Sequence, residues 1–446
     1  MHRIILALML ALLLFAPLSA RSADKYGITK KTLDNGLDVI VVHNPGVPLV
    51  TVEINVKNGG FTEGPEYTGL SHLYEHMFFK ANKVIPNQER YLERLREIGA
   101  SWNGTTGDER VNYFFTVPKD SILPAMVFMH NAITGPLFQQ EELVKERPVV
   151  IGEYDRAEAN PYYLLYVAVN KKVWWKYYSR KNALGERDVI LNATTQKMQT
   201  IQNRYYIPNN SALILAGDIT PDEGFSLAEK VFSSWKRGPD PFKANPIPEH
   251  PPIPKTDTVV ITAPVNAVTV MMEWHGPSVT KDPKATYAAD ILSYILRQRS
   301  SRFFRNLIES GLAYGADLNY LTLAHTGPIT VNAQTSAEKY KSFLEAFRKE
   351  LNDMGSPDYF SDDQLTNAKT ILATEEEYGR ERPSQFAHTV GLWWAIAGLD
   401  YYLNYVENSA KVTRKDISDY LTRYVIGKPY IMGTLLSADD RKTLGF

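Results

Sequence analysis

The amino-acid sequence predicts an α+β fold of two homologous domains, each with an antiparallel sheet packed against helices. The chain has 446 residues, which is more than a single hydrophobic core usually holds. A proline-rich segment divides it, and the order of strand and helix patterns before this segment recurs after it. Because the strand patterns occur in runs and the helix patterns are long, we expect antiparallel sheets rather than alternating parallel units.

The first 23 residues have the pattern of a secretory signal peptide. A short basic start precedes an apolar run from Ile4 to Ala16 and a stretch of small residues, with candidate cleavage points after Ala20 and Ala23. An uncleaved membrane anchor is the alternative, but the run is shorter than the roughly 20 residues that span a bilayer. We therefore expect a periplasmic or secreted protein that is not held in a membrane after signal cleavage.

The composition narrows the possible chemistry. With 44% hydrophobic residues the chain can bury sizeable cores, and its net charge of -1 provides no basic field that would gather nucleic acid. The sequence has no cysteine, which excludes disulfides, a cysteine nucleophile and thiolate metal ligands. Any metal must therefore be held by histidine and carboxylate side chains.

Residues 239–256 form the predicted linker between a first domain, residues 24–238, and a second domain, residues 257–446. Seven prolines lie between Pro239 and Pro254. Neither a helix nor a central strand fits that composition.

The two predicted domains share their internal order. Residues 49–56 (LVTVEINV) have a strand pattern and precede a helix pattern through residues 69–79. In the second domain, residues 267–274 (AVTVMMEW) precede a helix pattern through residues 285–296. The repeated order predicts an internal duplication.

A candidate metal site lies in the first of these helices. His72 and His76 are four residues apart, so a helix places their side chains about 40° apart around its axis, and both imidazoles can reach one ion. Glu75 then lies beside the ion, where its carboxylate can accept a proton from water. This H-x-x-E-H order is the reverse of H-E-x-x-H and is typical of inverzincins. The pattern predicts a zinc hydrolase site.

A zinc hydrolase needs a third protein ligand and an open coordination position. Glu153 is the best candidate, because Glu146 lies two helical turns before it on the same face and Gly152 permits close backbone approach. On spacing alone Asp155 or Glu158 could serve instead. A solvated acidic helix face is the other interpretation of these residues.

These residues resemble those of the pitrilysin family, peptidase family M16. Its pattern is H-x-x-E-H, then 76 intervening residues and a glutamate, which in this chain is Glu153. The resemblance implies that His72, His76 and Glu153 bind one Zn2+ per chain and that Glu146 orients a ligating histidine. It also favours the branch of two-domain subunits similar to the mitochondrial processing peptidase. We expect Pro148 to kink the helix or to force its restart.

The resemblance extends to peptide binding. Residues 99–106 (GASWNGTT) are similar to the edge strand along which members of the family bind extended peptide, which implies that Asn103, Gly104 and Thr105 contact substrate. A turn at Asn103 and Gly104 is the alternative interpretation.

The second half departs from the metal pattern but keeps one catalytic element of the family. At the place of the H-x-x-E-H motif it offers only Asp290. Tyr314 lies in a G-L-A-Y element whose tyrosine, in the family, helps to hold the substrate carbonyl. The companion arginine of the family is replaced by Leu307, or by Ile308 if one residue is deleted.

The resemblance therefore implies a zinc metallopeptidase that cleaves peptides, with Glu75 as the general base. In the family four homologous domains enclose a chamber, and this chain supplies two. We expect a heterodimer with a homologous exported M16-like chain that lacks the zinc motif and provides the arginine and tyrosine. A homodimer that uses Arg302 or Arg305 is the alternative.

Two other functions stay open. The chain could be a non-catalytic or structural partner subunit, although the complete set of His72, Glu75, His76 and Glu153 disfavours this. It could also be a zinc amidohydrolase acting on a small molecule, which the peptide-binding segment around Asn103 disfavours.

Overall fold

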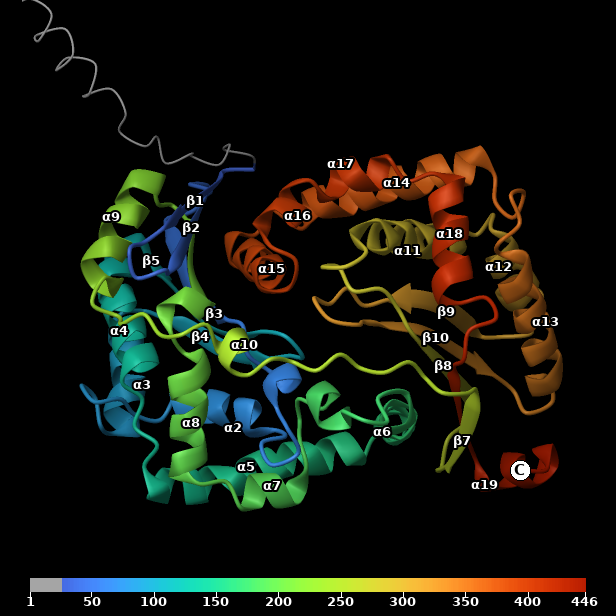
Figure 1. The fold of residues 1–446 in the computed structure, drawn as a ribbon, viewed down its shortest axis with the longest axis horizontal. Helices are drawn as coiled ribbons and strands as arrows, with labels where there is room; N and C mark the ends of the chain where they lie inside the picture. Colours follow the sequence, from blue (N-terminus) through green and yellow to red (C-terminus); the bar gives the residue numbers. More distant parts are fainter. Residues whose placement is uncertain (1–25) are drawn as a thin grey trace, which may run out of the picture.

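The computed structural model describes residues 26–446, so the predicted signal peptide lies outside the described residues. Two sheets stand side by side, each covered by helices (Figure 1). The predicted α+β fold with two sheet-and-helix units is confirmed. No helix between residues 26 and 446 is long and apolar enough to cross a bilayer.

The first sheet has six strands in the order β1-β2-β6-β3-β5-β4, and β4 forms one of its outer edges. Neighbouring strands are antiparallel except for the parallel pair β2 and β6. The strands are β1 (Ile28–Thr32), β2 (Asp38–His43), β3 (Leu49–Val56), β4 (Ser101–Thr106), β5 (Val111–Pro118) and β6 (Ser211–Gly217).

The second sheet has five strands in the order β7-β11-β8-β10-β9, with the parallel pair β7 and β11. Both sheets are therefore mostly antiparallel, with one parallel pair each. The strands are β7 (Asp257–Thr262), β8 (Val268–His275), β9 (Gly315–Tyr320), β10 (Pro328–Thr335) and β11 (Ile431–Leu436).

Helices connect the strands in both halves. In the first half they are α2 (Leu70–Phe78), α3 (Gln88–Glu97), α4 (Ile122–Thr134), α5 (Gln140–Glu158), α6 (Pro161–Val173), α8 (Thr195–Tyr205) and α9 (Pro221–Phe232), with the short α7 (Arg187–Leu191). In the second half they are α11 (Pro283–Leu296), α13 (Tyr340–Asp353), α14 (Asp362–Tyr378), α15 (Pro383–Ile396) and α18 (Arg414–Tyr424), with the short α12 (Arg302–Phe304), α16 (Leu399–Leu403), α17 (Tyr405–Ala410) and α19 (Ala438–Leu444).

Strand β3 shows how the alternation of side chains builds the first half. Val50, Val52 and Ile54 point into a core that includes residues of α4, whereas Glu53 and Asn55 point to the opposite face. A helix of the second half covers that opposite face. The polar residues of β3 are thus buried at a contact between the two halves.

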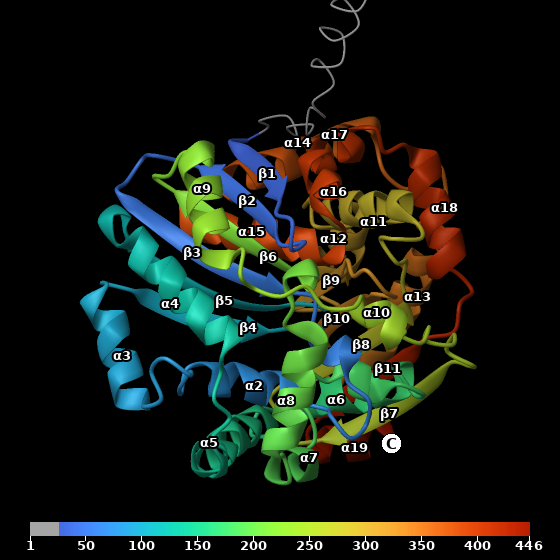
Figure 2. The ribbon, with the colours of Figure 1, turned by 60° about the vertical axis from the view of Figure 1, so that its left-hand side comes forward.

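The two halves exchange one helix each. Helix α15 of the second half lies against β3 and β6, and α6 of the first half lies against β8 and β11 (Figures 1 and 2). Two glycines permit this close packing: a Cβ at Gly391 would lie 2.4 Å from the Asn55 side chain, and one at Gly433 would lie 2.4 Å from Val169. Each sheet is therefore completed by a helix from the other half.

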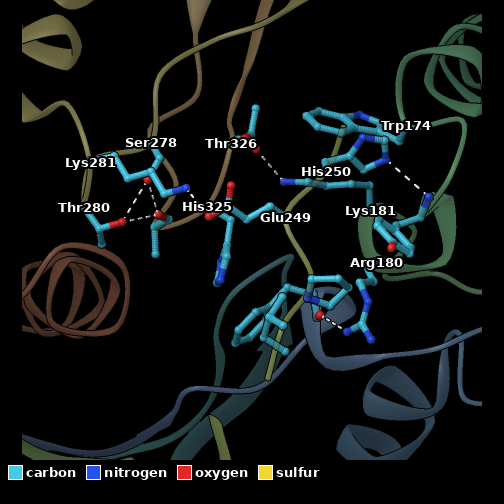
Figure 3. Close-up of a pocket in the computed structure, with 15 residues that line it drawn as sticks. Trp174, Arg180, Lys181, Glu249, His250, Ser278, Thr280, Lys281, His325 and Thr326 are labelled. Carbon is cyan, nitrogen blue, oxygen red and sulfur yellow. Dashed lines mark hydrogen bonds and ion pairs between the residues drawn. The ribbon is translucent and has the colours of Figure 1, made fainter. Parts of the chain in front are cut away.

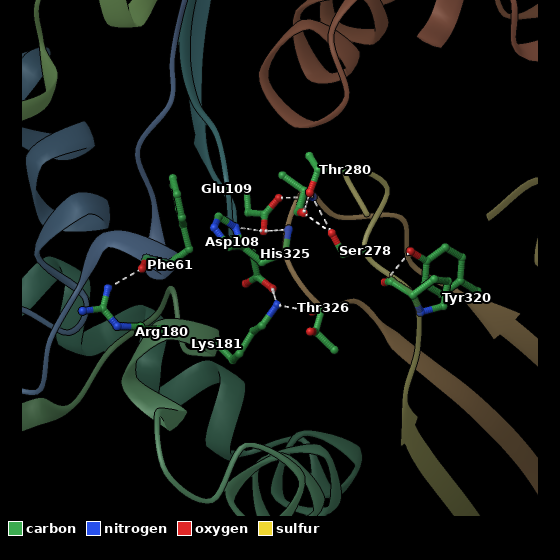
Figure 4. A network of polar contacts seen from close by, with 12 residues as sticks. Phe61, Asp108, Glu109, Arg180, Lys181, Ser278, Thr280, Tyr320, His325 and Thr326 are labelled. Atoms are coloured by element: carbon green, nitrogen blue, oxygen red, sulfur yellow. Dashed lines mark hydrogen bonds and ion pairs between the residues drawn. The ribbon is translucent and has the colours of Figure 1, made fainter. Parts of the chain in front are cut away.

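A buried polar network joins the halves at the turn between β4 and β5 (Figure 4). The Glu109 carboxylate accepts hydrogen bonds from the backbone N–H groups of Ala324 (2.5 Å) and His325 (2.9 Å), and it contacts Nδ1 of His325 at 2.8 Å. The buried Lys181 ammonium donates to the Thr326 carbonyl (2.9 Å). These contacts attach one loop of the second half to the first.

A cavity of about 240 Å³ lies beside this network (Figure 3). Residues of the linker and of both halves line it, including Trp174, Lys181, His250 and Thr326. None of the proposed zinc ligands is among its lining residues. It is therefore separate from the site described below.

The structure corrects one local expectation and part of another. The linker contains a short helix, α10 (Pro241–Ala244), because Pro241 occupies its first turn and the Asp240 side chain accepts from the Phe242 N–H at 2.9 Å. Helix α5 continues through Pro148, so the helix does not restart there, and the kink stays a prediction. A proline within a helix removes one backbone hydrogen bond, and the hydrogen bonds of the remaining turns are sufficient to keep this 19-residue helix continuous.

Candidate metal centre and active site

Helix α2 presents its polar side chains on one face. Leu73, Met77 and Phe78 are fully buried in the first core, whereas His72 and His76 are partly exposed. Residues three and four apart share a helix face, so the apolar positions fix which way the two imidazoles point. They face α5, which packs against α2.

The structure brings three candidate ligand atoms together. Nε2 of His72 lies 3.3 Å from Nε2 of His76, and the two nitrogens lie 3.4 and 3.6 Å from Oε2 of Glu153. Tetrahedral ligands at about 2.0–2.1 Å from zinc are roughly 3.3 Å apart, so this spacing suits one zinc ion. No second group of this kind occurs in residues 26–446.

The hydrogen bonds around His76 also suit a cation. Its Nδ1 lies 2.9 Å from Oε1 of Glu146, which is buried, and Lys80 pairs with the other Glu146 oxygen. When Nδ1 carries the proton and donates it to Glu146, Nε2 presents a lone pair to the group of three. This hydrogen bond is compatible with the expectation that Glu146 orients a ligating histidine.

Burial and neighbouring charges shift the pKa values at the site. Burial, with the nearby His76, lowers the pKa of His72 to about 4, which favours the neutral imidazole that binds metals. Burial opposes a charged His76, but the hydrogen bond to Glu146 and the charge of Glu153 outweigh it and raise its pKa. Burial raises the pKa of Glu75, and the charge of Glu153 adds to the effect.

Strand β4 holds Glu75 from the side opposite α5. Thr106 Oγ1 donates a hydrogen bond of 2.6 Å to Oε2 of Glu75. Gly104 lies against the same side chain, since a Cβ there would be 2.9 Å from Cγ of Glu75. The contact made by Thr106 was missed from the sequence, although its place two residues after Gly104 puts it on the same face of the strand.

The predicted peptide-binding segment lies at the edge of the first sheet. Asn103, Gly104 and Thr105 belong to β4, so the turn alternative at Asn103 is wrong. Strand β4 pairs only with β5 in the described sheet, and its other edge has no strand partner. Asn103 and Thr105 point to the face opposite Glu75, where Thr105 donates to Asn112.

The other two acidic candidates on α5, Asp155 and Glu158, form ion pairs with Arg187. Arg187 pairs with Asp155 and lies 2.6 Å from Oε2 of Glu158, while neither carboxylate joins the group around His72. Of the acidic residues considered from the sequence as a third ligand, the structure brings Glu153 to the two histidines.

The second half holds no comparable group at the corresponding helix, α11. Asp290 accepts a hydrogen bond of 2.7 Å from Tyr405, and burial raises its pKa to about 7. Tyrosine side chains, including Tyr287 and Tyr420, fill the surroundings. In the part of the chain that the structure describes, the candidate metal ligands belong to the first half alone.

Tyr314 lies just before β9, the outer strand of the second sheet, and its side chain is 66% exposed. No hydrogen bond or ion pair within residues 26–446 connects it with His72, Glu75, His76 or Glu153. Within this chain the structure thus shows no polar contact between Tyr314 and the candidate site.

The expected arginine is absent at its place in the second half. Leu307 is fully buried in the core, and Ile308 packs against that core. Of the two nearby arginines, Arg302 pairs with Asp353 at 2.8 Å, whereas Arg305 is exposed.

Comparison with known families agrees with this arrangement. The family described as Insulinase (Peptidase family M16) matches residues 38–184, and the Peptidase M16 inactive domain matches residues 192–372. The chain belongs to peptidase family M16. Its zinc-protease-like half is the half that holds His72, His76 and Glu153, and its inactive-type half is the one without them.

Relatives and solved structures of M16 proteins cover most of the chain. An uncharacterized zinc protease of Rickettsia felis is 26% identical over 378 residues, which are 84% of this chain and 89% of that protein. A Helicobacter pylori protease has the same fold, with a TM-score of 0.79, 21% identity and coverage of 91% and 98% of the two chains.

The first half of the periplasmic protease PqqL from Escherichia coli also matches in fold, with a TM-score of 0.76, 15% identity and 95% coverage of each chain. This chain covers 49% of the whole PqqL chain. It thus has about half the length of that M16 protein.

We expect Glu146→Gln to weaken zinc binding by about 10–100-fold, because partners of ligating histidines tune metal affinity by that amount. The measurement is the zinc dissociation constant in competition with a chelator. Glu141→Gln, an exposed change in the first turn of the same helix, is the matched control and should leave the constant unaltered. Equal constants for both variants and the unaltered chain would contradict the role given to Glu146.

Proposed function

We propose that this M16 protein is an exported zinc metallopeptidase that cleaves peptides in an extended conformation. The observation that carries the proposal is the spacing of His72, His76 and Glu153, with Glu75 held between them and the outer strand of a sheet. Zinc at these residues supplies Lewis acidity to the scissile carbonyl and to the attacking water.

The residues of this chain have separate parts in the proposed reaction. A peptide that pairs with the open edge of β4 is held through its backbone, largely independent of its sequence. Glu75 takes the proton from the attacking water and passes it to the leaving amine. Thr106 and Gly104 fix the carboxylate of Glu75 for both steps, because one donates to it and the other leaves room for it.

The two alternatives have less support. A non-catalytic partner subunit needs neither the ligand spacing nor the contact between Thr106 and Glu75. A small-molecule amidohydrolase does not need an open strand edge next to its base. The peptide-cleaving function is the one that uses all these features.

The test is cleavage of a mixed peptide pool by the purified chain, alone and together with a co-purifying homologue. We expect cleavage that a chelator abolishes and that stoichiometric zinc restores. Cleavage that survives complete zinc removal, or no cleavage by any zinc-loaded combination, would overturn the proposal.

A further inference from the structure

Helix α2, which carries the two candidate histidine ligands, begins without a side-chain cap. Its N-cap residue, Gly69, has a left-handed backbone with φ of 85° and no side chain. The first N–H groups of a helix have no partner within the helix, and here the first residues, Leu70 and Ser71, are buried. The Leu70 N–H donates to the Tyr67 carbonyl (2.9 Å), whereas the N–H groups of Gly69 and Ser71 need another acceptor.

The carboxylate of Glu63, six residues before Gly69, fills this place. It is 2% exposed, and its two oxygens accept hydrogen bonds from the N–H groups of Gly69 (2.7 Å) and Ser71 (2.6 Å). Burial raises the pKa of Glu63 to about 8, while the N–H donors of Ser71 and Gly69 and the helix dipole favour its ionised form. The Glu63 side chain thus holds the backbone at both Gly69 and Ser71, where the helix begins.

The loop that carries Glu63 is itself held in place. Thr62 Oγ1 donates to Asn58 Oδ1 (2.7 Å), and Asn58 Nδ2 donates to Ser71 Oγ (3.1 Å). On the other side Gly69 lies against Gly185, since a Cβ on Gly69 would be 2.7 Å from the Gly185 Cα. The first turn of α2 therefore has little freedom to rotate.

The two histidines on α2 differ in how their rings are oriented. Nδ1 of His76 is held by Glu146. Nδ1 of His72 is buried and has no hydrogen-bond partner in residues 26–446. The His72 ring therefore lacks a hydrogen bond at Nδ1 that would orient it, and its direction depends more on its backbone, which is next to the Ser71 N–H that Glu63 holds.

We propose that Glu63 is a positioning residue of the metal site, which sets the direction of His72 by fixing the start of α2. The inference rests on the proposed zinc function. Glu146 orients His76 by a hydrogen bond to its imidazole. In this arrangement Glu63 orients His72 by hydrogen bonds to the backbone at the start of the helix. Since α2 has only nine residues, a rotation at its start moves Nε2 of His72 relative to His76 and Glu153.

The test compares zinc binding in Glu63→Gln, Glu63→Asp and the unaltered chain, at a temperature where circular dichroism shows each to be folded. The glutamine offers one acceptor oxygen and an NH2 group that faces a backbone N–H, and the shorter aspartate can reach fewer donors. We expect the zinc dissociation constant to rise about tenfold or more and the visible spectrum of the cobalt-substituted site to change.

The matched control is Glu350→Gln in the second half. Glu350 is also 2% exposed, and its carboxylate accepts from Asn306 and Tyr359, each at 2.6 Å. This change should lower thermal stability while zinc affinity and the cobalt spectrum stay the same. Unaltered zinc affinity and spectrum in both Glu63 variants would overturn the inference, whereas an unaltered chain that binds no zinc would overturn the proposed function itself.

Discussion

Glu75→Gln is expected to keep its zinc and to cleave peptide about 10²–10⁴-fold more slowly, the usual contribution of a general base. The amide has the shape of the carboxylate, and its oxygen can still accept the hydrogen bond from Thr106. It cannot take a proton from water. The zinc ligands are left in place, so metal content should not change.

The measurements are kcat with a defined peptide and zinc content by elemental analysis. Glu158→Gln is the matched control, because Glu158 is a carboxylate of α5 that pairs with Arg187 and not with the group around His72. A fall in kcat of less than about tenfold in Glu75→Gln would contradict the role of this residue as the base.

The second large effect concerns assembly. We propose that a homologous exported chain supplies the arginine and tyrosine that this chain does not bring to its own site. Leu307 is buried where the arginine is expected, and Tyr314 has no polar contact with His72, Glu75, His76 or Glu153 within this chain. One missing donor to the transition state commonly costs 10²–10³ in rate, so adding the partner should raise cleavage by that factor.

The matching experiment mixes the two purified chains and follows peptide cleavage. A homodimer that uses an arginine of this chain is the alternative. Arg305 is exposed and available for it, whereas Arg302 is held by Asp353. Full activity of this chain alone, abolished by Arg305→Ala or Arg302→Ala, would rule out the heterodimer.

Local patterns predicted much of the fold. The alternation in LVTVEINV predicted a strand at residues 49–56, and β3 has these bounds, because its even-numbered residues face one core. The helix through residues 69–79 followed from its apolar spacing, and α2 covers Leu70–Phe78. A spacing of four residues on that helix was enough to predict that His72 and His76 lie together.

Long-range contacts could not be predicted in the same way. Nothing in the sequence of α6 or α15 shows that each helix covers the sheet of the other half. The apolar face of a helix does not specify which sheet it packs against. The contacts of Thr106 with Glu75 and of Lys80 with Glu146 depend on how β4 and α5 pack on α2. The two backbone partners of Glu63, Gly69 and Ser71, are likewise not indicated by its place in the sequence.

The most direct test of the whole account is the zinc content of the purified chain. We expect one zinc per chain, and its near-complete loss in His76→Ala, because His72, His76 and Glu153 form the one candidate group of ligands in residues 26–446. Two zinc ions per chain, or undiminished zinc in His76→Ala, would contradict it.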